Sequence, residues 1–307
     1  HNNSLVLFDR FSLENANAVV FGKSGGGKSY TIKLEILRSL VLGTQVVVID
    51  PEDEYKYLSE TVGGSVIRIS INSDQHINPF DLPVPHEGES SGDVFNSHIL
   101  NVAGLIKLLL GELTPQEDSI LDEALIQTYA IKDITPDTNF SSMPPPVLSD
   151  LQSVLEGMTG AESMATRLRK FTQGTFAGFL NRPTNVPLDN QLIVFGIRDM
   201  EEELRPVAMY LVLNFVWTQI RRDVRKRILV VDEAWWLMKY PVGADFLFNI
   251  AKRGRKYYVG LTTITQDIPD FMGTPQGKSI VTNSSMQILM KQSPAAIEVI
   301  KDAFNLT

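Results

Sequence analysis

Seven short runs of apolar and β-branched residues limit how this chain can fold. Each run is apolar on most positions of both alternating faces, which is typical of strands covered on two sides in a parallel sheet. We therefore predict a mainly parallel sheet. The runs are NAVVF (17–21), QVVVID (45–50), SVIRISI (65–71), QLIVFGI (191–197), ILVVD (228–232), YYVGLTTI (257–264) and MQILM (286–290).

Helical periods separate several of these runs. After Ser29 the apolar residues keep helical spacing up to Gly43, a residue type that commonly stands just past a helix end. A strand, a helix and a second strand in this order form a right-handed crossover unit, so the chain is predicted to have an α/β fold. The helical positions are Ile32, Leu34, Ile36, Leu37, Leu40 and Val41.

The middle of the chain departs from this alternation. Residues 90–187 contain helical periods, for example at 97–111, 115–131 and 148–158, and no convincing β run. Thr114 and Glu117 fit a capping box, with Pro115 at the first helical position, where its missing N–H costs little. We predict an all-helical subdomain at 90–187, inserted between the two parts of the sheet domain, 1–89 and 188–307.

The composition is that of an ordinary globular protein, and it excludes several kinds of site. The 307 residues contain no cysteine, which rules out disulfides and thiolate metal sites, and the four histidines have no metal-ligand spacing. With 28 basic and 36 acidic residues, the net charge is −8. This balance argues against a general polyanion binder but leaves room for a local basic surface.

The start of the chain and its most apolar segment carry two further expectations. The sequence begins HNNSLVLFDR, without a methionine or a signal-peptide pattern, and we interpret it as a fragment of a longer protein. The segment VAMYLVLNFVWTQI, at 207–220, is shorter than the roughly 18 to 20 residues of a membrane span, and Asn214 interrupts it. A helix buried against the sheet is the better interpretation.

The segment GKSGGGKS, at 22–29, lies directly between the first predicted strand and the first predicted helix. It matches the phosphate-loop pattern G-x-x-x-x-G-K-[ST], in which glycines let successive backbone N–H groups surround phosphate oxygens at a helix start. Lys28 would reach the β and γ phosphates of ATP, and Ser29 would bind Mg²⁺. The alternative is a glycine-rich turn without a ligand. The predicted nucleotide-binding residues are Gly25, Gly26, Gly27, Lys28, Ser29 and Tyr30.

A pair of acids, Asp232 and Glu233, ends the run at 228–232. Open α/β sheets bind ligands at the carboxyl edge of their strands, so we assign Asp232 to the Mg²⁺ shell and Glu233 to orienting or deprotonating the attacking water. The alternative is an acidic strand end without a catalytic role. The run at 45–50 also leads into acids, which either lie near the same site or, Asp50 apart, form a solvated loop. These acids are Asp50, Glu52, Asp53 and Glu54.

Polar residues also flank the run at 257–264. Gln266 follows it and is a candidate sensor of the γ-phosphate or holder of the water, with a structural amide as the alternative. Arg253 and Arg255 precede it and are candidate arginine fingers for the nucleotide site of an adjacent subunit, with a solvated basic face as the alternative. The basic run RRDVRKR, at 221–227, is interpreted as solvating a helix end, and contact with nucleic acid or a partner stays open.

Taken in order, these motifs resemble those of the hexameric motor ATPases of bacterial type IV secretion and conjugation, above all the large pilus-assembly ATPase of the TrbE and TraC type. The resemblance covers almost the whole chain. It implies a carboxyl-terminal P-loop domain with a RecA-like sheet and an all-helical appendage. The motifs are GKSGGGKS, VVVIDPEDEY, INPFD (77–81), ILVVDEAWWLM, AKRGRK and LTTITQD, and the combination of DPEDEY, DEAWWLM and RGRK to TTITQD is the most specific part.

The resemblance also implies a function and partners. The domain would hydrolyse Mg-ATP at the subunit interfaces of a ring, a hexamer in the full-length protein, whereas the fragment alone would be monomeric and turn over poorly. It would work on the cytoplasmic face of the inner membrane, beside other secretion ATPases and the membrane channel. Two other functions stay open: a DNA translocase of the coupling-protein kind, and a docking platform whose ring shape is set by ATP binding.

Overall fold

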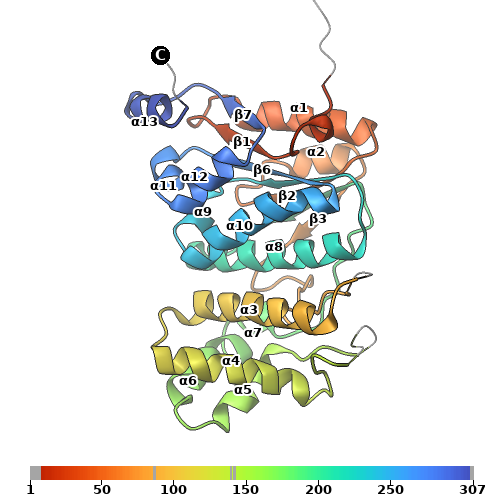
Figure 1. Ribbon diagram of the computed structural model, residues 1–307, viewed down its shortest axis with the longest axis vertical. Coiled ribbons are helices and arrows are strands. Elements are labelled where there is room, and N and C mark those ends of the chain that lie inside the picture. Colours follow the sequence, from red (N-terminus) through yellow and green to blue (C-terminus); the bar gives the residue numbers. More distant parts are fainter. Residues whose placement is uncertain (1–7, 86–87, 139, 141–142, 305–307) are drawn as a thin grey trace, which may run out of the picture. The chain divides into compact units, whose positions relative to one another are not determined.

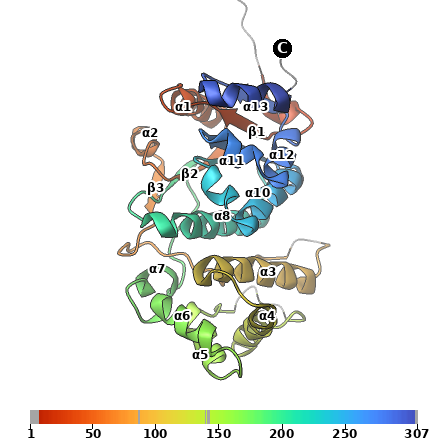
Figure 2. The same ribbon diagram turned by 90° about the vertical axis from the view of Figure 1, so that its left-hand side faces the viewer.

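The computed structural model describes residues 8–85, 88–138, 140 and 143–304, and the chain divides into two compact units. Unit 1 comprises residues 1–48, 61–63 and 225–307, and unit 2 comprises residues 49–60 and 64–224. Figure 1 and Figure 2 label the elements of both units and colour them along the sequence. The domain boundaries expected from the sequence, after residues 89 and 187, stay a prediction.

All seven predicted strands are present and form one parallel sheet, which confirms the predicted fold class. The strand order is β3-β4-β2-β5-β6-β1-β7. In unit 1, β1 lies between β6 and β7, and β5 pairs with the other side of β6. In unit 2, β3 pairs with β4. The strands are β1 (Ala18–Phe21), β2 (Gln45–Asp50), β3 (Ser65–Arg68), β4 (Leu192–Gly196), β5 (Arg227–Val231), β6 (Val259–Thr265) and β7 (Met286–Leu289).

The core of unit 1 follows from strands that are buried on both faces. Every residue of β1, β5 and β6 is buried. Helix α10 packs on α12, and α11 contacts α9, α12 and α13. The helical elements of unit 1 are η1 (Arg10–Ser12), α1 (Lys28–Val41), α9 (Trp235–Met238), α10 (Pro241–Arg253), η3 (Gly254–Tyr257), α11 (Ile268–Met272), α12 (Pro275–Thr282) and α13 (Pro294–Phe304).

The side chain of Asn17 fixes the start of β1 in this core. It is 2% exposed, and its amide group donates to the carbonyls of Ala251 and Asn283 at 2.8 and 2.9 Å. Its carbonyl oxygen accepts from the N–H of Leu261 in β6 at 3.0 Å. Because a buried amide is costly without partners, these three bonds define where β1 enters the sheet.

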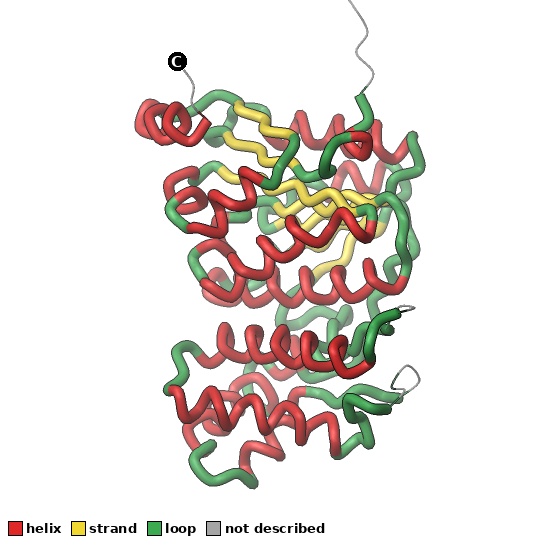
Figure 3. The backbone as a smooth tube through the Cα atoms, in the orientation of Figure 1, coloured by secondary structure: helices red, strands yellow, loops and turns green. Residues whose placement is uncertain are grey.

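Unit 2 contains a set of helices that follow one another without a strand. Between residues 91 and 180 the described part of the chain forms only helices and loops, as Figure 3 shows. The predicted capping box at Thr114 and Glu117 is confirmed, with both reciprocal hydrogen bonds present. The helical elements of unit 2 are α2 (Lys56–Thr61, whose last residue belongs to unit 1), α3 (Ser91–Leu110), α4 (Pro115–Ala130), α5 (Leu148–Glu156), α6 (Glu162–Thr172), α7 (Ala177–Leu180), η2 (Glu202–Leu204) and α8 (Arg205–Arg222).

Two helices of unit 2 are long and apolar. The segment expected to form a buried helix lies in α8, where Phe215 meets Phe195 of β4 edge to face at 6.3 Å. Helix α3 has the length and mean hydropathy (1.2) that would allow it to cross a membrane, but 56% of that window is buried within the protein. This degree of burial is equally typical of a core helix.

A buried histidine joins α3 to α4. The ring Nε2 of His98 lies 2.8 Å from the hydroxyl oxygen of Tyr129, and that hydroxyl donates to the carbonyl of Phe80 at 2.9 Å. The Tyr129 hydroxyl donates its only proton to Phe80. In the hydrogen bond between the two rings, Nε2–H of His98 is therefore the donor and the Tyr129 oxygen is the acceptor. The other ring nitrogen, Nδ1, is buried and has no partner among the described residues. Burial lowers the pKa of His98 to about 3, so the ring is neutral.

The lowered pKa predicts an acid-sensitive stability. The pKa of His98 is about 3 in the folded protein and about 6.5 in an unfolded chain, so the unfolded state takes up the proton first as the pH falls. The loss of stability begins below about pH 6.5 and amounts to roughly 2–3 kcal/mol by about pH 4.5. Urea unfolding of the wild type and of His98→Gln should show this pH slope only in the wild type. Parallel pH profiles for the two proteins would contradict it.

Candidate nucleotide site

The carboxyl ends of four strands of unit 1 meet at one edge of the sheet. The register pairs Phe21 of β1 with Thr265 of β6 and with Leu289 of β7, and Val231 of β5 with Thr263 of β6. Ligands of open α/β sheets bind at this edge. The residues predicted from the phosphate loop, the acid pair and Gln266 all follow directly after these strand ends, within unit 1.

The phosphate loop is held to the sheet by backbone hydrogen bonds. The N–H of Gly22 donates to the carbonyl of Thr265 at 3.4 Å, and the N–H of Lys23 donates to the carbonyl of Lys291 at 2.9 Å. Within the loop, the N–H of Gly26 closes a turn on the carbonyl of Lys23 at 3.0 Å. The loop therefore has a defined shape that its own backbone bonds maintain.

Two glycines of the loop are required by its conformation. Gly27 has φ = 89° and directly precedes α1, a left-handed backbone that side chains with a Cβ disfavour. At Gly26 an added Cβ would lie 2.8 Å from the carbonyl oxygen of Lys23, a contact shorter than real Cβ atoms tolerate. This explains in physical terms why the segment is rich in glycine.

The helix that follows the loop supplies the remaining groups. Ser29 lies in the first turn of α1, whose first N–H groups have no carbonyl partner in their own helix and favour an anion. Lys28 is only 8% exposed, and its ammonium lies 3.3 Å from the carbonyl of Lys23, so it folds back over its own loop. Tyr30, the last predicted nucleotide-binding residue, is 69% exposed on the same turn.

The acid pair stands on a sharp turn after β5. Asp232 is 5% exposed, and its Oδ1 accepts the N–H of Glu233 at 2.9 Å. Glu233 has φ = 47°, a left-handed value that is uncommon for a residue with a side chain. Its Oε2 accepts the indole N–H of Trp235 at 2.6 Å. The N–H of Ala234 donates to the carbonyl of Ile264 at 2.9 Å, which ties this turn to β6.

The polar residues at the end of β6 have different environments. The hydroxyl of Thr263 is buried and has no partner among the described residues, whereas the hydroxyl of Thr265 accepts the N–H of Asp267 at 3.1 Å. Gln266 is exposed, directly after the strand residue that pairs with Phe21. It is thus placed next to the start of the phosphate loop, and its role stays a prediction.

The sequence did not indicate the role of the segment after β7. The amide of Gln292 donates to the carbonyl of Phe21 at 2.9 Å and to that of Met290 at 2.8 Å, and Lys291 accepts from the phosphate loop as described above. A Cβ added at Gly22 would lie 3.0 Å from the Cβ of Met290, a tight contact. These contacts depend on β7 lying beside β1, which no local pattern reveals.

Arg253 and Arg255 lie at the opposite end of β6. Both are exposed, Arg253 at the end of α10 and Arg255 in η3, before the strand begins at Val259. Strand β6 runs from Val259 to Thr265, a length of about 20 Å at roughly 3.3 Å per residue. The arrangement therefore does not bring these arginines together with the phosphate loop of the same chain.

Asp50 and Glu52, two of the acids at the end of β2, have partners within unit 2. The buried carboxylate of Asp50 accepts the N–H groups of Glu52, Glu54 and Tyr55, at 3.3, 3.1 and 2.8 Å. Burial raises the pKa of Asp50, although these hydrogen bonds oppose the rise. Glu52 pairs with Arg205 at 3.1 Å. The oxygen atoms of Asp50 are thus occupied in shaping the turn.

The basic run at 221–227 contains exposed residues, namely Arg222, Arg225 and Lys226, and residues that pair with neighbours. Arg221 pairs with Glu89 at 2.5 Å, and Arg222 donates to the carbonyl of Leu82 at 3.4 Å. Lys226 pairs with Asp9 at 3.3 Å, and Arg227 is 4% exposed with its guanidinium on the side chain of Gln45. The segment is thus exposed at Arg222 and Lys226 despite these contacts, and it is buried only at Arg227.

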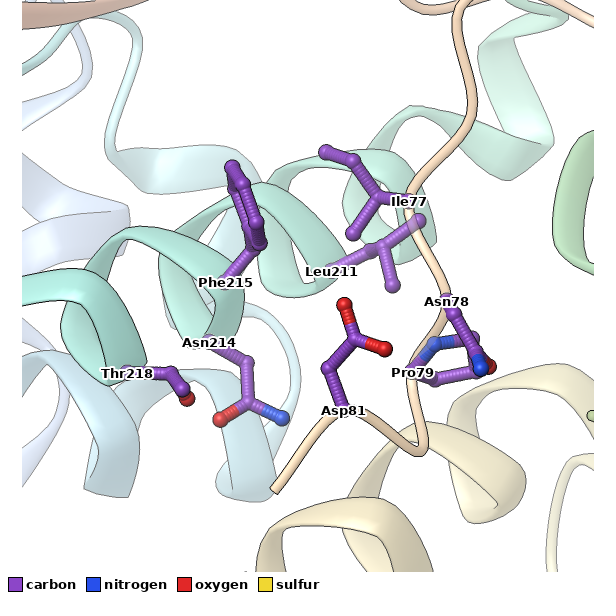
Figure 4. A pocket seen from close by; sticks show the side chains of 8 residues that line it. All are labelled: Ile77, Asn78, Pro79, Asp81, Leu211, Asn214, Phe215 and Thr218. Carbon is purple, nitrogen blue, oxygen red and sulfur yellow. The ribbon is translucent and has the colours of Figure 1, made fainter. Parts of the chain in front are cut away.

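The INPFD motif at 77–81 forms a small pocket with α8 in unit 2. Figure 4 shows the lining side chains, with Asp81 facing the helix. Asn78 shapes the motif, since its amide donates to the carbonyl of Pro146 at 2.8 Å and its oxygen accepts the N–H of Phe80 at 3.1 Å. Burial raises the pKa of Asp81, and a hydrogen bond from Thr184 opposes this. The lining residues are Ile77, Asn78, Pro79, Asp81, Leu211, Asn214, Phe215 and Thr218.

The residues at the sheet edge fit a magnesium nucleotide better than a metal bound by protein alone. The described residues contain no group of three or more His, Cys, Asp or Glu side chains that could hold a metal ion. Mg²⁺ usually keeps several waters and takes one or two protein oxygens together with substrate phosphates. Ser29 and Asp232 offer a hydroxyl and a carboxylate of this kind, beside the glycine cradle.

This fold and this site together define a P-loop nucleotide-binding protein. The sequence matches the TraG P-loop domain over residues 6–307. The chain therefore belongs to the TraG P-loop domain family.

Known proteins of secretion and conjugation are similar to the chain. Protein TraC of Escherichia coli (strain K12) is 25% identical over 95% of the chain and 34% of TraC. Type IV secretion system protein CagE of Helicobacter pylori is 21% identical over 80% of the chain and 26% of CagE. These matches confirm the resemblance predicted from the sequence. The chain spans about a third or less of the length of these two relatives.

Solved structures show the same fold. VirB4 of Thermoanaerobacter pseudethanolicus matches with a TM-score of 0.90 and 30% identity, over 99% of this chain and 86% of that one. The conjugative coupling protein TrwB matches with a TM-score of 0.60 and 15% identity, over 94% and 72% of the two chains, and this likeness concerns the fold alone. TrwB has been solved with an ATP analogue and with ADP and Mg²⁺.

The position of Lys28 leads to a test of nucleotide binding. Lys28→Ala should weaken ATP binding about tenfold to hundredfold, because a hydrogen bond to a charged group is worth roughly 1.5–3 kcal/mol. Arg38→Ala, an exposed position on the same helix, is the matched control and should leave affinity unchanged. Titration with a fluorescent ATP analogue measures both. Equal affinities for Lys28→Ala and the wild type would refute the phosphate-loop assignment.

Proposed function

We propose that this domain hydrolyses Mg-ATP, and that the hydrolysis drives assembly of, or substrate transfer through, a bacterial type IV secretion or conjugation system. The observation that carries the proposal is the convergence of the phosphate loop, the acid pair and Gln266 at the carboxyl edge of one parallel sheet. A loop alone binds a nucleotide, whereas hydrolysis also needs a carboxylate beside the attacking water. The edge offers both.

Each group has a role that its surroundings support. The N–H groups of the loop and Lys28 would hold the phosphates, and Ser29 and Asp232 would hold Mg²⁺, which neutralises charge on the phosphates when bound. Glu233 would orient or deprotonate the water, and Gln266 would sense the γ-phosphate. Tyr30 is exposed next to the loop and would contact the nucleotide from there.

The active form in this proposal is a ring, in which Arg253 or Arg255 of one subunit completes the site of the next. Both arginines are exposed and lie before the start of β6, about 20 Å along the strand from the end beside their own phosphate loop, so they are suited to a neighbour's site. An arginine finger supplied in trans raises phosphoryl-transfer rates by about 10³ to 10⁵. The full-length protein would form a hexamer, whereas this chain alone would be largely monomeric.

The relatives suggest where the ring works. CagE is a type IV secretion system protein, and TraC and VirB4 are similar to this chain over most of its length. We place the full-length protein on the cytoplasmic face of the inner membrane, with other secretion ATPases and the membrane channel as partners. A DNA translocase is the second candidate, and the fold shared with the coupling protein TrwB favours it. A docking platform that only binds ATP would need no catalytic Glu233.

The rate of ATP hydrolysis per subunit, measured over a wide range of protein concentration, tests the proposal. The specific rate should rise with concentration, because neighbouring subunits complete each other's sites, and it should not respond to DNA. A rate that is independent of concentration but increases on adding DNA would favour the translocase, particularly if DNA binding weakens steeply with salt. Glu233→Gln should bind ATP and lose hydrolysis. In the full-length protein, secretion by this variant would favour the docking platform.

Arg255→Ala should leave ATP affinity nearly unchanged and lower turnover by about 10³-fold, because its contact acts mainly in the transition state. Lys278→Ala, which removes an exposed cation on α12, is the control and should keep the wild-type rate. Both variants are assayed at a concentration where the wild-type rate has reached its plateau. An equal loss of affinity and rate in Arg255→Ala would place the arginine in its own subunit's site instead.

A further inference from the structure

The indole of Trp235 contacts Glu233, the residue that we propose orients or deprotonates the attacking water. Its Nε1–H donates to Oε2 of Glu233 at 2.6 Å, and both side chains are half-buried. A hydrogen bond from an N–H to a carboxylate is shorter and stronger than one between neutral groups. Two positions along the chain separate the residues, so the bond is local to the turn between β5 and α9.

The backbone of Glu233 is fixed independently of this bond. Its φ of 47° is a strained value, and its N–H is tied to Asp232 while the next N–H is tied to Ile264 of β6. Strained residues at functional sites persist when the surrounding contacts over-determine them. Hence the backbone of Glu233 is rigid, and the remaining freedom of this residue lies in its side-chain torsions.

The ring of Trp235 is held in turn by its neighbours. It stacks on the ring of Trp236, with centroids 4.7 Å apart and planes 26° from parallel. The ammonium of Lys239 lies 4.2 Å from the centroid of the Trp235 ring, a cation–π contact. With its ring supported in this way, the indole N–H keeps one direction and offers Glu233 a fixed donor.

We infer that Trp235 is a positioning residue for the catalytic glutamate. Its N–H holds one carboxylate oxygen and thereby removes rotational freedom from the side chain of Glu233 before nucleotide arrives. A base oriented by a third group is a recurrent arrangement in catalytic sites. Fixing the torsions of a glutamate side chain costs conformational entropy. If Trp235 has already fixed them before the reaction, the rate rises about tenfold. This inference rests on the proposed function of Glu233.

The hydrogen bond itself is tested without any enzymatic activity. The chain has three tryptophans, so a ¹H–¹⁵N spectrum of the nucleotide-free protein contains three indole N–H signals. Trp235→Phe assigns one of them. In Glu233→Ala this signal should move upfield, because the carboxylate acceptor is gone, and the signal of Trp217 should stay in place. An unchanged Trp235 signal would overturn the inference, and this test does not require Trp235→Phe to be active.

The effect on turnover is tested with a matched pair of variants. Trp235→Phe keeps an aromatic ring but loses the N–H, and it should lower kcat about tenfold while KM for ATP changes less than about twofold. Trp217→Phe makes the same chemical change in α8, outside the turn that carries Trp235, and should keep the wild-type kcat. The inference is overturned by an unchanged or increased kcat in Trp235→Phe, or by an equal loss in both variants.

The double variant separates this inference from the proposed function. If Trp235 acts through Glu233, then adding Trp235→Phe to Glu233→Gln should lower the residual rate no further, a non-additivity that a double-mutant cycle measures. A full additional tenfold loss would overturn the inference. Wild-type hydrolysis by Glu233→Gln would instead refute the proposed role of the glutamate. If Glu233→Gln is inactive and Trp235→Phe is normal, only the role of Trp235 fails.

Discussion

The parallel pairing of β1 with β6 on one side and β7 on the other is the constraint on which the rest of the site depends. Parallel strands end at the same edge, so the register of Phe21 with Thr265 and Leu289 sets the height at which the phosphate loop leaves the sheet. The N–H groups of the loop then donate hydrogen bonds to carbonyls on both sides, those of Thr265 and Lys291. A slip of this register would therefore displace the cradle.

Several polar groups of the site are satisfied by the protein itself. The ammonium of Lys28 lies on a carbonyl of its own loop, the carboxylate of Glu233 accepts an indole N–H, and the amide of Gln292 bridges two carbonyls. Buried polar groups without partners are costly, so these internal contacts stabilise the site. In the proposed nucleotide complex, Lys28 would give up this carbonyl for phosphate oxygens, so the lost contact would offset part of the affinity gained.

Much of the fold could be predicted because the strongest signals are local. Strands such as 45–50 and 228–231 are apolar on both faces, the capping box at Thr114 is a short-range pattern, and the phosphate loop combines a conformational need with a chemical one. Asp50 shows the limit of such reasoning. Its place at a strand end indicated a site residue, but its carboxylate accepts three N–H groups of the following turn, and composition alone does not distinguish these roles.

The remaining features depend on contacts between distant segments. Gln292 touches β1 only because β7 is its neighbour, and the hydrogen bond from Trp235 to Glu233 depends on a left-handed turn that sequence spacing does not specify. In the basic run at 221–227, Arg222, Arg225 and Lys226 are exposed, as expected of a solvated run, whereas Arg221 and Arg227 contact Glu89 and Gln45, which lie far away along the chain. Local patterns contain no information about such partners.

Strand β6 is a stiff element of unit 1 that lies between Arg255 and Gln266. It is hydrogen-bonded along both sides, to β5 and to β1, so it resists stretching and bending. Gln266 stands at one end and Arg255 just before the other. The strand therefore fixes the spacing between Gln266, beside the phosphate loop, and Arg255, before its opposite end.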